Sequence, residues 1–159
     1  MLCMALTSAA WAGAGLGILS SVGKNVMARS AKLEPKAKKK VPHEFVLEAL
    51  APMNPEVRRM FSGFAVYLGN QLVLMLRDHV RSPRDNGVWL VLAEDTNPSD
   101  RALRREFPSL RRIELLGGAI GHWLLIPSDS PDFESEALHA CELLLRRDPR
   151  LGRIPKSRR

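Results

Sequence analysis

Three pairs of adjacent arginines are the side chains of this chain best suited to chemistry on an anion. The pairs are Arg58-Arg59, Arg104-Arg105 and Arg111-Arg112. A guanidinium group holds a phosphate or carboxylate through two parallel hydrogen bonds, so pairs that met on one face could bind phosphate or nucleic acid. Each pair also has a nearby acidic residue, namely Glu56, Glu106 or Glu114. We therefore favour solvated ion pairs over a shared anion site.

No group of side chains has the spacing of a catalytic or metal site. The four histidines are His43, His79, His122 and His139. None has a second ligand at a helical i, i+4 step. His122 lies in an apolar run, where a hydrogen-bonded structural role is the simpler interpretation. Glu94 and Asp95 are adjacent and would face opposite ways in a strand, and helix capping explains Asp95 more simply. We predict no catalytic residue, no metal and no cofactor.

The net charge of +7 is concentrated in two flanking segments. Residues 24–40 hold seven Lys/Arg and one Glu, and residues 146–159 hold seven Lys/Arg and one Asp, whereas residues 41–145 hold 10 basic and 15 acidic residues. Basic tails attract polyanions over about a Debye length, but they can also simply keep a protein soluble, which we favour. The candidate phosphate or nucleic-acid contacts are Lys36, Lys38, Lys39, Lys40, Arg146, Arg147, Arg150, Arg153 and Lys156.

Residues 1–23 carry no charged side chain and allow three interpretations. A secretory signal would need a basic start, which is lacking. A weak membrane anchor has just enough length, and Lys24 and Arg29 would keep the next region in the cytoplasm. A translation start at Met27 would leave the segment out of the working protein. We favour the start at Met27 and expect a cytoplasmic protein, with membrane contact only if residues 1–23 are an anchor.

The length allows one domain with a substantial core. We predict an apolar leader over residues 1–26, a disordered basic tail over 27–42, a folded domain over 43–147 and a basic C-terminal tail over 148–159. Cys141 lies far from the other cysteine in sequence and is expected to pack as a small apolar residue.

Apolar runs between turn signals predict an α+β fold. A helix begins at His43, a short helix spans 101–106, and a final helix follows a Ser130 cap with Pro131 at its first position. Its apolar stripe consists of Phe133, Ala137, Cys141, Leu144 and Leu145. The expected strands span 57–61, 64–68, 71–77, 88–93, 112–116 and 120–126. An antiparallel sheet of about five to six strands is then flanked by three helices. Since the runs are almost continuously apolar, we expect helices or a second subunit to cover both faces.

Residues 57–76 begin with a specific sequence motif. A basic pair leads into Met60-Phe61, Gly63 follows two residues later, and Gly69-Asn70 turns the chain into a second apolar run. This region resembles the N-terminal domain of TfoX-type proteins, where a Met-Phe-Gly-Gly-like motif precedes a short hairpin. In element order the resemblance extends over about 45–147, and the small MmcQ/YjbR-like domains are a second choice. The motif residues that it singles out are Arg59, Met60, Phe61, Gly63 and Tyr67.

The resemblance implies a regulatory domain without catalytic activity, which acts through protein–protein contacts and is linked to DNA-uptake competence or transcription regulation. A protein partner or a second copy in a homodimer would then be its ligand. The alternative is a nucleic-acid-binding accessory protein whose two basic tails hold phosphates. A third hypothesis is a small enzyme with a pocket near Arg59, Tyr67 and His122.

Overall fold

The computed structural model describes residues 40–95, 97–115 and 121–156. The apolar leader and the lysines at positions 36, 38 and 39 lie outside the described residues, as does the beginning of the strand expected at 120–126. None of the helices in the described ranges is long and apolar enough to cross a membrane.

The predicted α+β fold is confirmed. A single six-stranded sheet has the order β1-β2-β3-β4-β6-β5, and every neighbouring pair is antiparallel. Its strands are β1 (Glu56–Met60), β2 (Gly63–Leu68), β3 (Gln71–Arg77), β4 (Gly87–Val91), β5 (Arg111–Arg112) and β6 (Trp123–Pro127). The α-helices are α1 (Glu44–Ala49), α2 (Asn97–Glu106) and α3 (Phe133–Leu145), and 3-10 turns span Ala51–Met53 and Pro83–Asp85.

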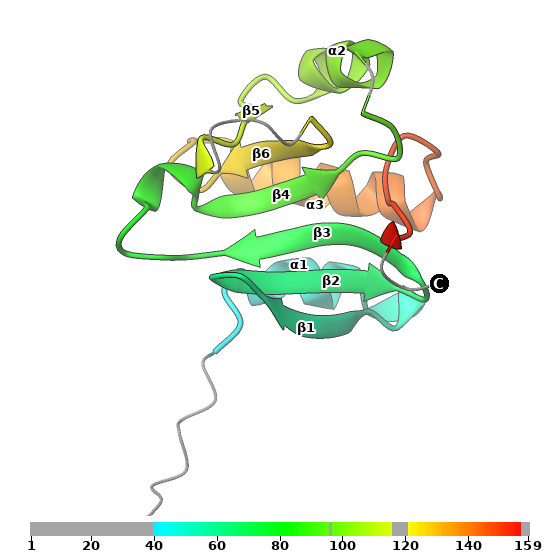
Figure 1. The fold of residues 1–159 in the computed structure, drawn as a ribbon, viewed down its shortest axis with the longest axis horizontal. Coiled ribbons are helices and arrows are strands. Elements are labelled where there is room, and N and C mark those ends of the chain that lie inside the picture. The colour runs from blue at the N-terminus through cyan, green and yellow to red at the C-terminus, as the bar shows by residue number, and fades with distance from the viewer. Residues whose placement is uncertain (1–39, 96, 116–120, 157–159) are drawn as a thin grey trace, which may run out of the picture. The chain divides into compact units, whose positions relative to one another are not determined.

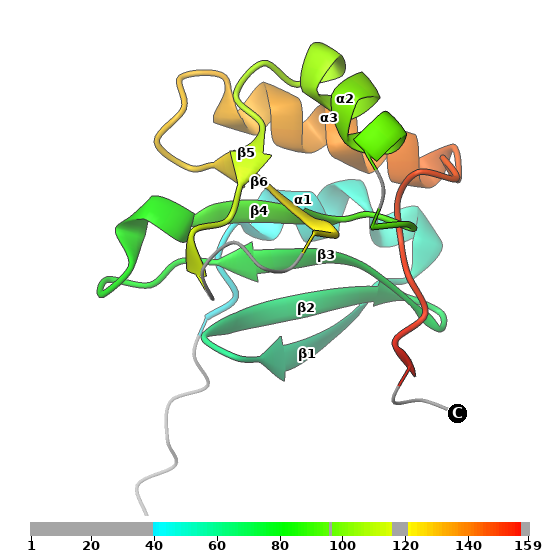
Figure 2. The same cartoon turned by 45° about the horizontal axis from the view of Figure 1, so that its top comes forward.

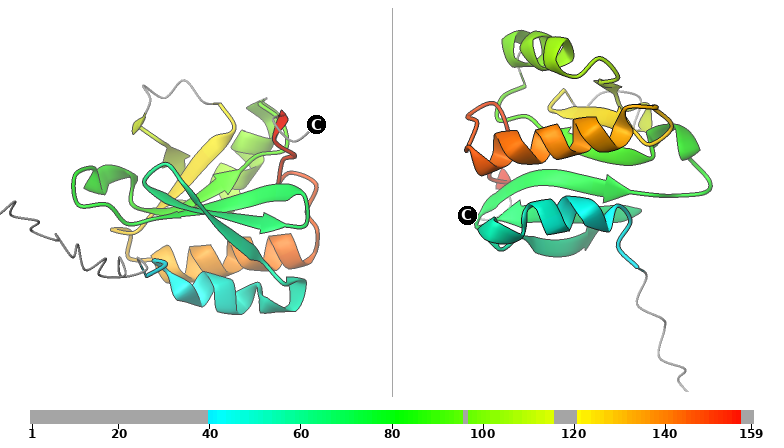
Figure 3. Two further views of the ribbon diagram at one scale, coloured as in Figure 1. Left: turned by 60° about the horizontal axis from the view of Figure 1, so that its bottom comes forward. Right: turned by 180° about the vertical axis from the view of Figure 1, so that it is seen from behind.

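Two helices cover one face of the sheet. Figure 1 shows α1 and α3 behind the strands, with α2 near the β5 edge, and Figure 3 shows α1 and α3 side by side on that face. Because side chains alternate along a strand, Val66, Leu74 and Leu90 point into the core beneath these helices. Cys141 joins this core as expected: it is buried, and burial raises the pKa of its thiol to about 12.

The opposite face holds a second apolar cluster, which includes Met75, Trp89 and Trp123. The segment after β5 covers it: Ile113 is buried in the cluster and Leu115 packs against it. Figure 2 shows this segment running across the sheet. Both faces are therefore covered within one chain, and a second subunit is not needed to bury the apolar strands.

One buried carboxylate holds the covering segment in place. Asp85 accepts the backbone N–H of Glu114 at 2.9 Å and that of Leu115 at 2.8 Å. Its own carbonyl oxygen accepts the indole N–H of Trp89 at 2.8 Å. Asp85 is 3% exposed, and the Arg111 guanidinium lies 3.9 Å from its carboxylate.

The prediction of a basic C-terminal tail from residue 148 is wrong over residues 148–154, which we call the C-terminal strap. The strap fills the gap where β3 and β4 separate. The N–H and carbonyl of Arg153 bond to Leu72, Gly152 N–H donates to Val91, and Ala93 N–H donates to Arg150. Leu151 is buried in the main core. Hydrogen bonding to two strand ends overrides the polar composition that favoured a tail.

The final helix follows its prediction in part. Its regular part begins at Phe133, two residues later than expected. The Ser130 hydroxyl oxygen accepts the Asp132 N–H at 3.3 Å, which is the bond expected of Ser130 as the cap. Leu145 of the expected stripe is 39% exposed, whereas Leu143, outside that stripe, is buried. Ala137, Cys141 and Leu144 of the expected stripe are buried as predicted, so the apolar face keeps most of the stripe and also includes Ala140 and Leu143.

Gly63 is required by a close approach between β2 and β3. A Cβ atom at this position would lie 2.6 Å from the backbone oxygen of Leu76 and 2.8 Å from the methyl group of Met75. We expect Gly63→Ala to lower the free energy of unfolding by about 1–3 kcal/mol, because the strand must shift to relieve the overlap. Gly121→Ala is the matched control, since its nearest atom is 3.6 Å away. Urea denaturation measures both, and equal stabilities would contradict the expectation.

Candidate functional site

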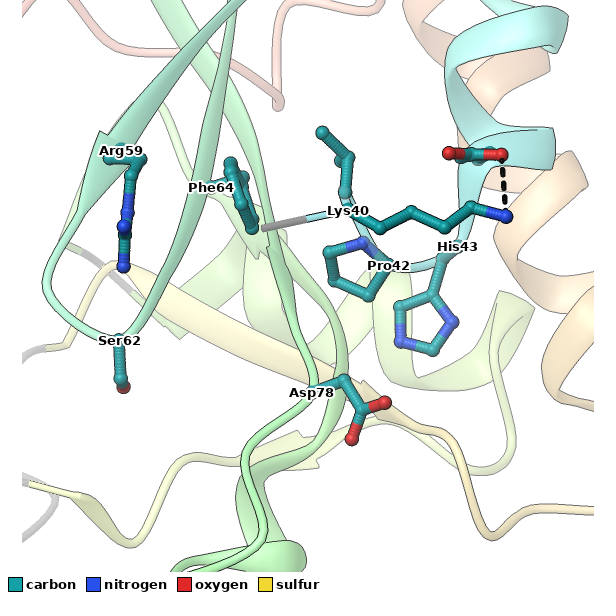
Figure 4. Close-up of a pocket in the computed structure, with 9 residues that line it drawn as sticks. Lys40, Pro42, His43, Arg59, Ser62, Phe64 and Asp78 are labelled. Carbon is teal, nitrogen blue, oxygen red and sulfur yellow. Dashed lines mark ion pairs between the residues drawn. The ribbon is translucent and has the colours of Figure 1, made fainter. Parts of the chain in front are cut away.

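One end of the sheet gathers two loops and the start of a helix around a pocket. The β1–β2 turn, the β3–β4 loop and the residues that lead into α1 all lie at this end (Figure 1). The pocket has a volume of about 470 Å³. Its lining residues are Lys40, Val41, Pro42, His43, Glu44, Arg59, Ser62, Phe64 and Asp78. Figure 4 shows Arg59 and Ser62 on the hairpin side, with Pro42, His43 and Asp78 across from them.

The tip of the β1–β2 hairpin holds an exposed aromatic side chain in a strained backbone conformation. Met60 pairs with Gly63, so Phe61 and Ser62 form a two-residue turn. Phe61 has a φ of 52° and Ser62 does not have a positive φ. A positive φ at the first turn position alone marks the turn type that favours glycine there. Phe61 nevertheless occupies it, and 73% of the residue is exposed.

Behind the turn lies a buried arginine. Arg77 is 1% exposed, and its Nη1 donates to the Ser62 hydroxyl oxygen at 2.6 Å. Its guanidinium carbon lies 5.7 Å from the centre of the Trp89 ring. Within the described residues its Nε has no hydrogen-bond partner. Burial lowers the pKa of Arg77, with Asp85 acting in the opposite direction, but a guanidinium remains charged near neutral pH.

The walls of the pocket carry both signs of charge. Arg59 is exposed and its guanidinium lies 5.8 Å from the Phe64 ring. Lys40 Nζ lies 3.3 Å from the carboxylate of Glu44, so these two charges largely cancel. Asp78 accepts a hydrogen bond of 3.2 Å from the side-chain amide of Asn86.

His43 joins the pocket to the sheet. Its Nε2 lies 3.3 Å from the carbonyl oxygen of Arg77, and its ring meets that of Phe133 edge-on at 4.9 Å. Since a carbonyl oxygen only accepts, Nε2 carries the proton. Burial lowers the pKa of His43 below 6.5, while the Arg77 carbonyl and Asp78 act in the opposite direction.

The lowered pKa of His43 predicts a pH dependence of stability. Below pH 6.5 the unfolded chain takes up the His43 proton before the folded chain does, so this residue's contribution falls as the pH decreases from 6.5 towards the folded pKa. Titration of the His43 ring by NMR should give a midpoint below that of N-acetyl-histidine amide. A midpoint at or above the reference would contradict the burial that we describe.

A smaller pocket of about 340 Å³ lies beside the C-terminal strap. Asp95 joins its polar groups: its carboxylate lies 2.5 Å from Arg153 Nη1 and 3.1 Å from His122 Nδ1. Arg153 lowers the pKa of Asp95, and burial lowers that of His122. The Asp95 carboxylate makes these two bonds, whereas the helix cap that the sequence suggested for Asp95 stays a prediction, because residue 96 lies outside the described residues. The arrangement links the strap to β4 and β6.

The arginine pairs do not converge. Arg58 pairs with Glu56 at 2.5 Å, as expected, but β1 and β5 are opposite edges of the sheet. Arg111 therefore lies far along the sheet from Arg58, and a phosphate clamp built from all three pairs is excluded. The third hypothesis is also not supported, because Arg59 packs on Phe64 beside the main core and Tyr67 lies in the second cluster.

The C-terminal candidates for phosphate binding are mostly used by the fold. Arg150 pairs with Glu106 and with Asp148, each at 2.6 Å, and Arg153 pairs with Asp95. Arg146, Arg147 and Lys156 are exposed. Of the four lysines of the N-terminal candidates, only Lys40 is described, and it pairs with Glu44.

Three residues of structural importance were missed at the sequence level: Ser62, Arg77 and Asp85. Arg77 ends β3 directly after five apolar residues, 72–76, and this position was the available signal of a buried charge. Among the described residues, no three His, Cys, Asp or Glu side chains are grouped in a way that could hold a metal ion.

No protein-family model matches the chain, and no curated protein or solved structure matches it. The resemblance to TfoX-type domains therefore stays a prediction.

Proposed function

We propose that this chain is a binding domain without catalytic activity, which recognises a partner polypeptide through the end of the sheet that carries the β1–β2 turn. The observation that carries the proposal is Phe61, a large apolar side chain that is 73% exposed at a φ of 52°. A bulky residue at positive φ costs about 1–2 kcal/mol, and glycine would avoid this cost. Retaining an exposed aromatic there is best explained by contacts outside the folded chain.

A second exposed apolar residue supports the same surface. Val80 is 93% exposed in the loop that follows β3, and β3 is the neighbour of β2 in the sheet. Both loops leave the sheet at the same end (Figure 1). The pocket begins next to each loop, at Ser62 and Asp78. Aromatic and apolar anchors beside a pocket are the usual centre of a protein interface, where a few residues supply most of the binding energy.

The alternative of a nucleic-acid-binding accessory protein loses part of its basis, because Arg150 and Arg153 are held in ion pairs within the domain. A regulatory role in competence or transcription rests on the family resemblance alone. The partner itself can be a different protein or a second copy of the chain, and the experiment below separates these two cases.

Replacing Phe61 with glycine should abolish partner binding without loss of stability. We expect the free energy of unfolding of Phe61→Gly to stay equal or rise by about 1 kcal/mol, since glycine accepts the left-handed conformation without strain. The immobilised full-length chain is compared with the variant in capture from cell extract of the source organism, with quantitative mass spectrometry. A partner retained by the wild type should be depleted at least tenfold by the variant.

Ile154→Ser is the matched control for this experiment. Ile154 is 60% exposed and is the last residue of the C-terminal strap. Its neighbour Arg153 bonds to Leu72, at the end of β3 away from Arg77 and the β1–β2 turn. Light scattering on purified protein tests for a dimer, and a dimer that Phe61→Gly alone dissociates identifies a second copy as the partner. Equal capture by the wild type and Phe61→Gly, with no change of oligomeric state, would refute the proposed surface. A large loss of stability would show that Phe61 serves the fold.

A further inference from the structure

We propose that the pocket beside the β1–β2 turn receives a carboxylate side chain of the partner polypeptide. This inference rests on the proposed function and specifies its chemistry. The first observation is the hydrogen-bond direction at Ser62. A guanidinium group only donates, so the bond from buried Arg77 at 2.6 Å makes the Ser62 oxygen an acceptor. The hydroxyl proton is then not directed at Arg77 and is available to an acceptor in the pocket that Ser62 lines.

The charge on this wall favours an anion as that acceptor. Arg77 is 1% exposed and stands directly behind Ser62, where water screens its charge poorly. Arg59 lies on the same side of the pocket in Figure 4, exposed and stacked towards Phe64. A hydroxyl donor backed by one buried guanidinium group, with a second guanidinium group on the same wall of the pocket, can bind an oxyanion through charge-assisted hydrogen bonds.

The opposite wall selects between a carboxylate and a phosphate. Asp78 lies across the pocket from Arg59 and Ser62 (Figure 4). Lys40 adds little net charge because it is paired with Glu44 at 3.3 Å. Arg59 and Arg77 against Asp78 leave one net positive charge at the pocket, which a carboxylate with one negative charge neutralises and a phosphate group with nearly two overcompensates. The charge balance therefore fits a single negative charge.

The position of the pocket fits a peptide ligand. Ser62 follows Phe61 directly in the turn, so a carboxylate bound at Ser62 would lie one residue away from the position that carries the exposed aromatic ring. A partner segment with an acidic residue next to an apolar one would then contact both features at once. The apolar contact at Phe61 would supply most of the binding energy, whereas the interaction of the partner's carboxylate with the Ser62 hydroxyl and the nearby arginines would set the specificity.

The test is an NMR titration of the ¹⁵N-labelled full-length chain with three small probes at constant ionic strength. The probes are N-acetyl-glutamate α-amide, N-acetyl-glutamine amide and N-acetyl-phosphoserine amide. We expect the glutamate probe to shift the amide signals of Ser62 and Gly63 and the Nε signal of Arg59, and to bind at least fivefold more tightly than the other two. Arg59→Gln and Ser62→Ala should each weaken its binding at least fivefold.

Arg105→Gln is the control, because it removes the same charge from an exposed position on α2. Equal binding of the glutamate and glutamine probes would overturn the inference, and so would unchanged affinity in Arg59→Gln and Ser62→Ala. Tighter binding of the phosphoserine probe would replace the carboxylate with a phosphate and also overturn it. These titrations need no partner, so the pocket can fail while Phe61→Gly still abolishes partner capture. If the glutamate probe bound as expected but Phe61→Gly left partner capture and oligomeric state unchanged, only the proposed function would be refuted.

Discussion

Replacing Asp85 with alanine is expected to lower the free energy of unfolding by about 3–5 kcal/mol, the range for breaking a buried charged network. Two backbone N–H groups, those of Glu114 and Leu115, would lose their acceptor. Arg77 and Arg111 would lose the nearby carboxylate that offsets their positive charges. The segment after β5 would then detach and expose the Trp89 side of the sheet.

Urea denaturation followed by tryptophan fluorescence measures this loss, since Trp89 and Trp123 both lie in the affected cluster. Asp85→Asn should cost less than Asp85→Ala, because one acceptor oxygen is retained. Asp129→Ala is the control for an exposed carboxylate in a turn and should change stability by less than about 0.5 kcal/mol. If Asp85→Ala matched that control, the anchoring role of Asp85 would be wrong.

Deleting the residues after Arg147 should destabilise the domain by about 4 kcal/mol or more, because the deletion removes buried Leu151 together with the strap. Leu72, Val91 and Ala93 would each lose a backbone hydrogen-bond partner where β3 and β4 separate. The ion pairs from Arg150 to Glu106 and from Arg153 to Asp95 would also disappear. A domain that ends at residue 147, as the sequence suggested, is thus incomplete.

Deleting only the last three residues, after Lys156, provides the control and should leave the melting temperature unchanged. Leu151→Ser and Ile154→Ser make the same kind of change at a buried and at an exposed position, since Leu151 is 4% exposed and Ile154 is 60% exposed. A difference between the two variants therefore reports the effect of burial. We expect the first variant to lose most of the stability that the longer deletion removes, and the second to lose almost none. A deletion after Arg147 that melts like the full chain would show that the strap is dispensable.

The fold class and most elements could be predicted because they depend on local patterns. The Gly69-Asn70 turn and the apolar runs on either side specify the hairpin of β2 and β3. The continuous apolar character of β4 indicated burial on both faces, and all five of its residues are buried. The prediction of Cys141 as a buried core residue is also confirmed, because its place in the apolar stripe of a helix is a local pattern.

The C-terminal strap could not be predicted, because its partners are distant in sequence. Arg153 pairs with Asp95, 58 residues away, and Arg150 with Glu106, 44 residues away. In the sequence these residues appear as isolated charges in a basic segment. Only the separation of β3 and β4 creates the unpaired backbone groups that bind the strap.

The candidate site shows the same division between local and tertiary information. The sequence by itself determined the hairpin of β2 and β3, because turn chemistry and apolar periodicity are local. It placed Phe61 at the end of a strand over 57–61, whereas β1 ends at Met60 and Phe61 lies in the turn. Only the tertiary structure decided that Phe61 is exposed, that Arg77 is buried behind Ser62, and that Asp78 stands across the pocket. The physical reason is that burial and charge–charge distance depend on how strands far apart in sequence pair and on which loops their ends bring together.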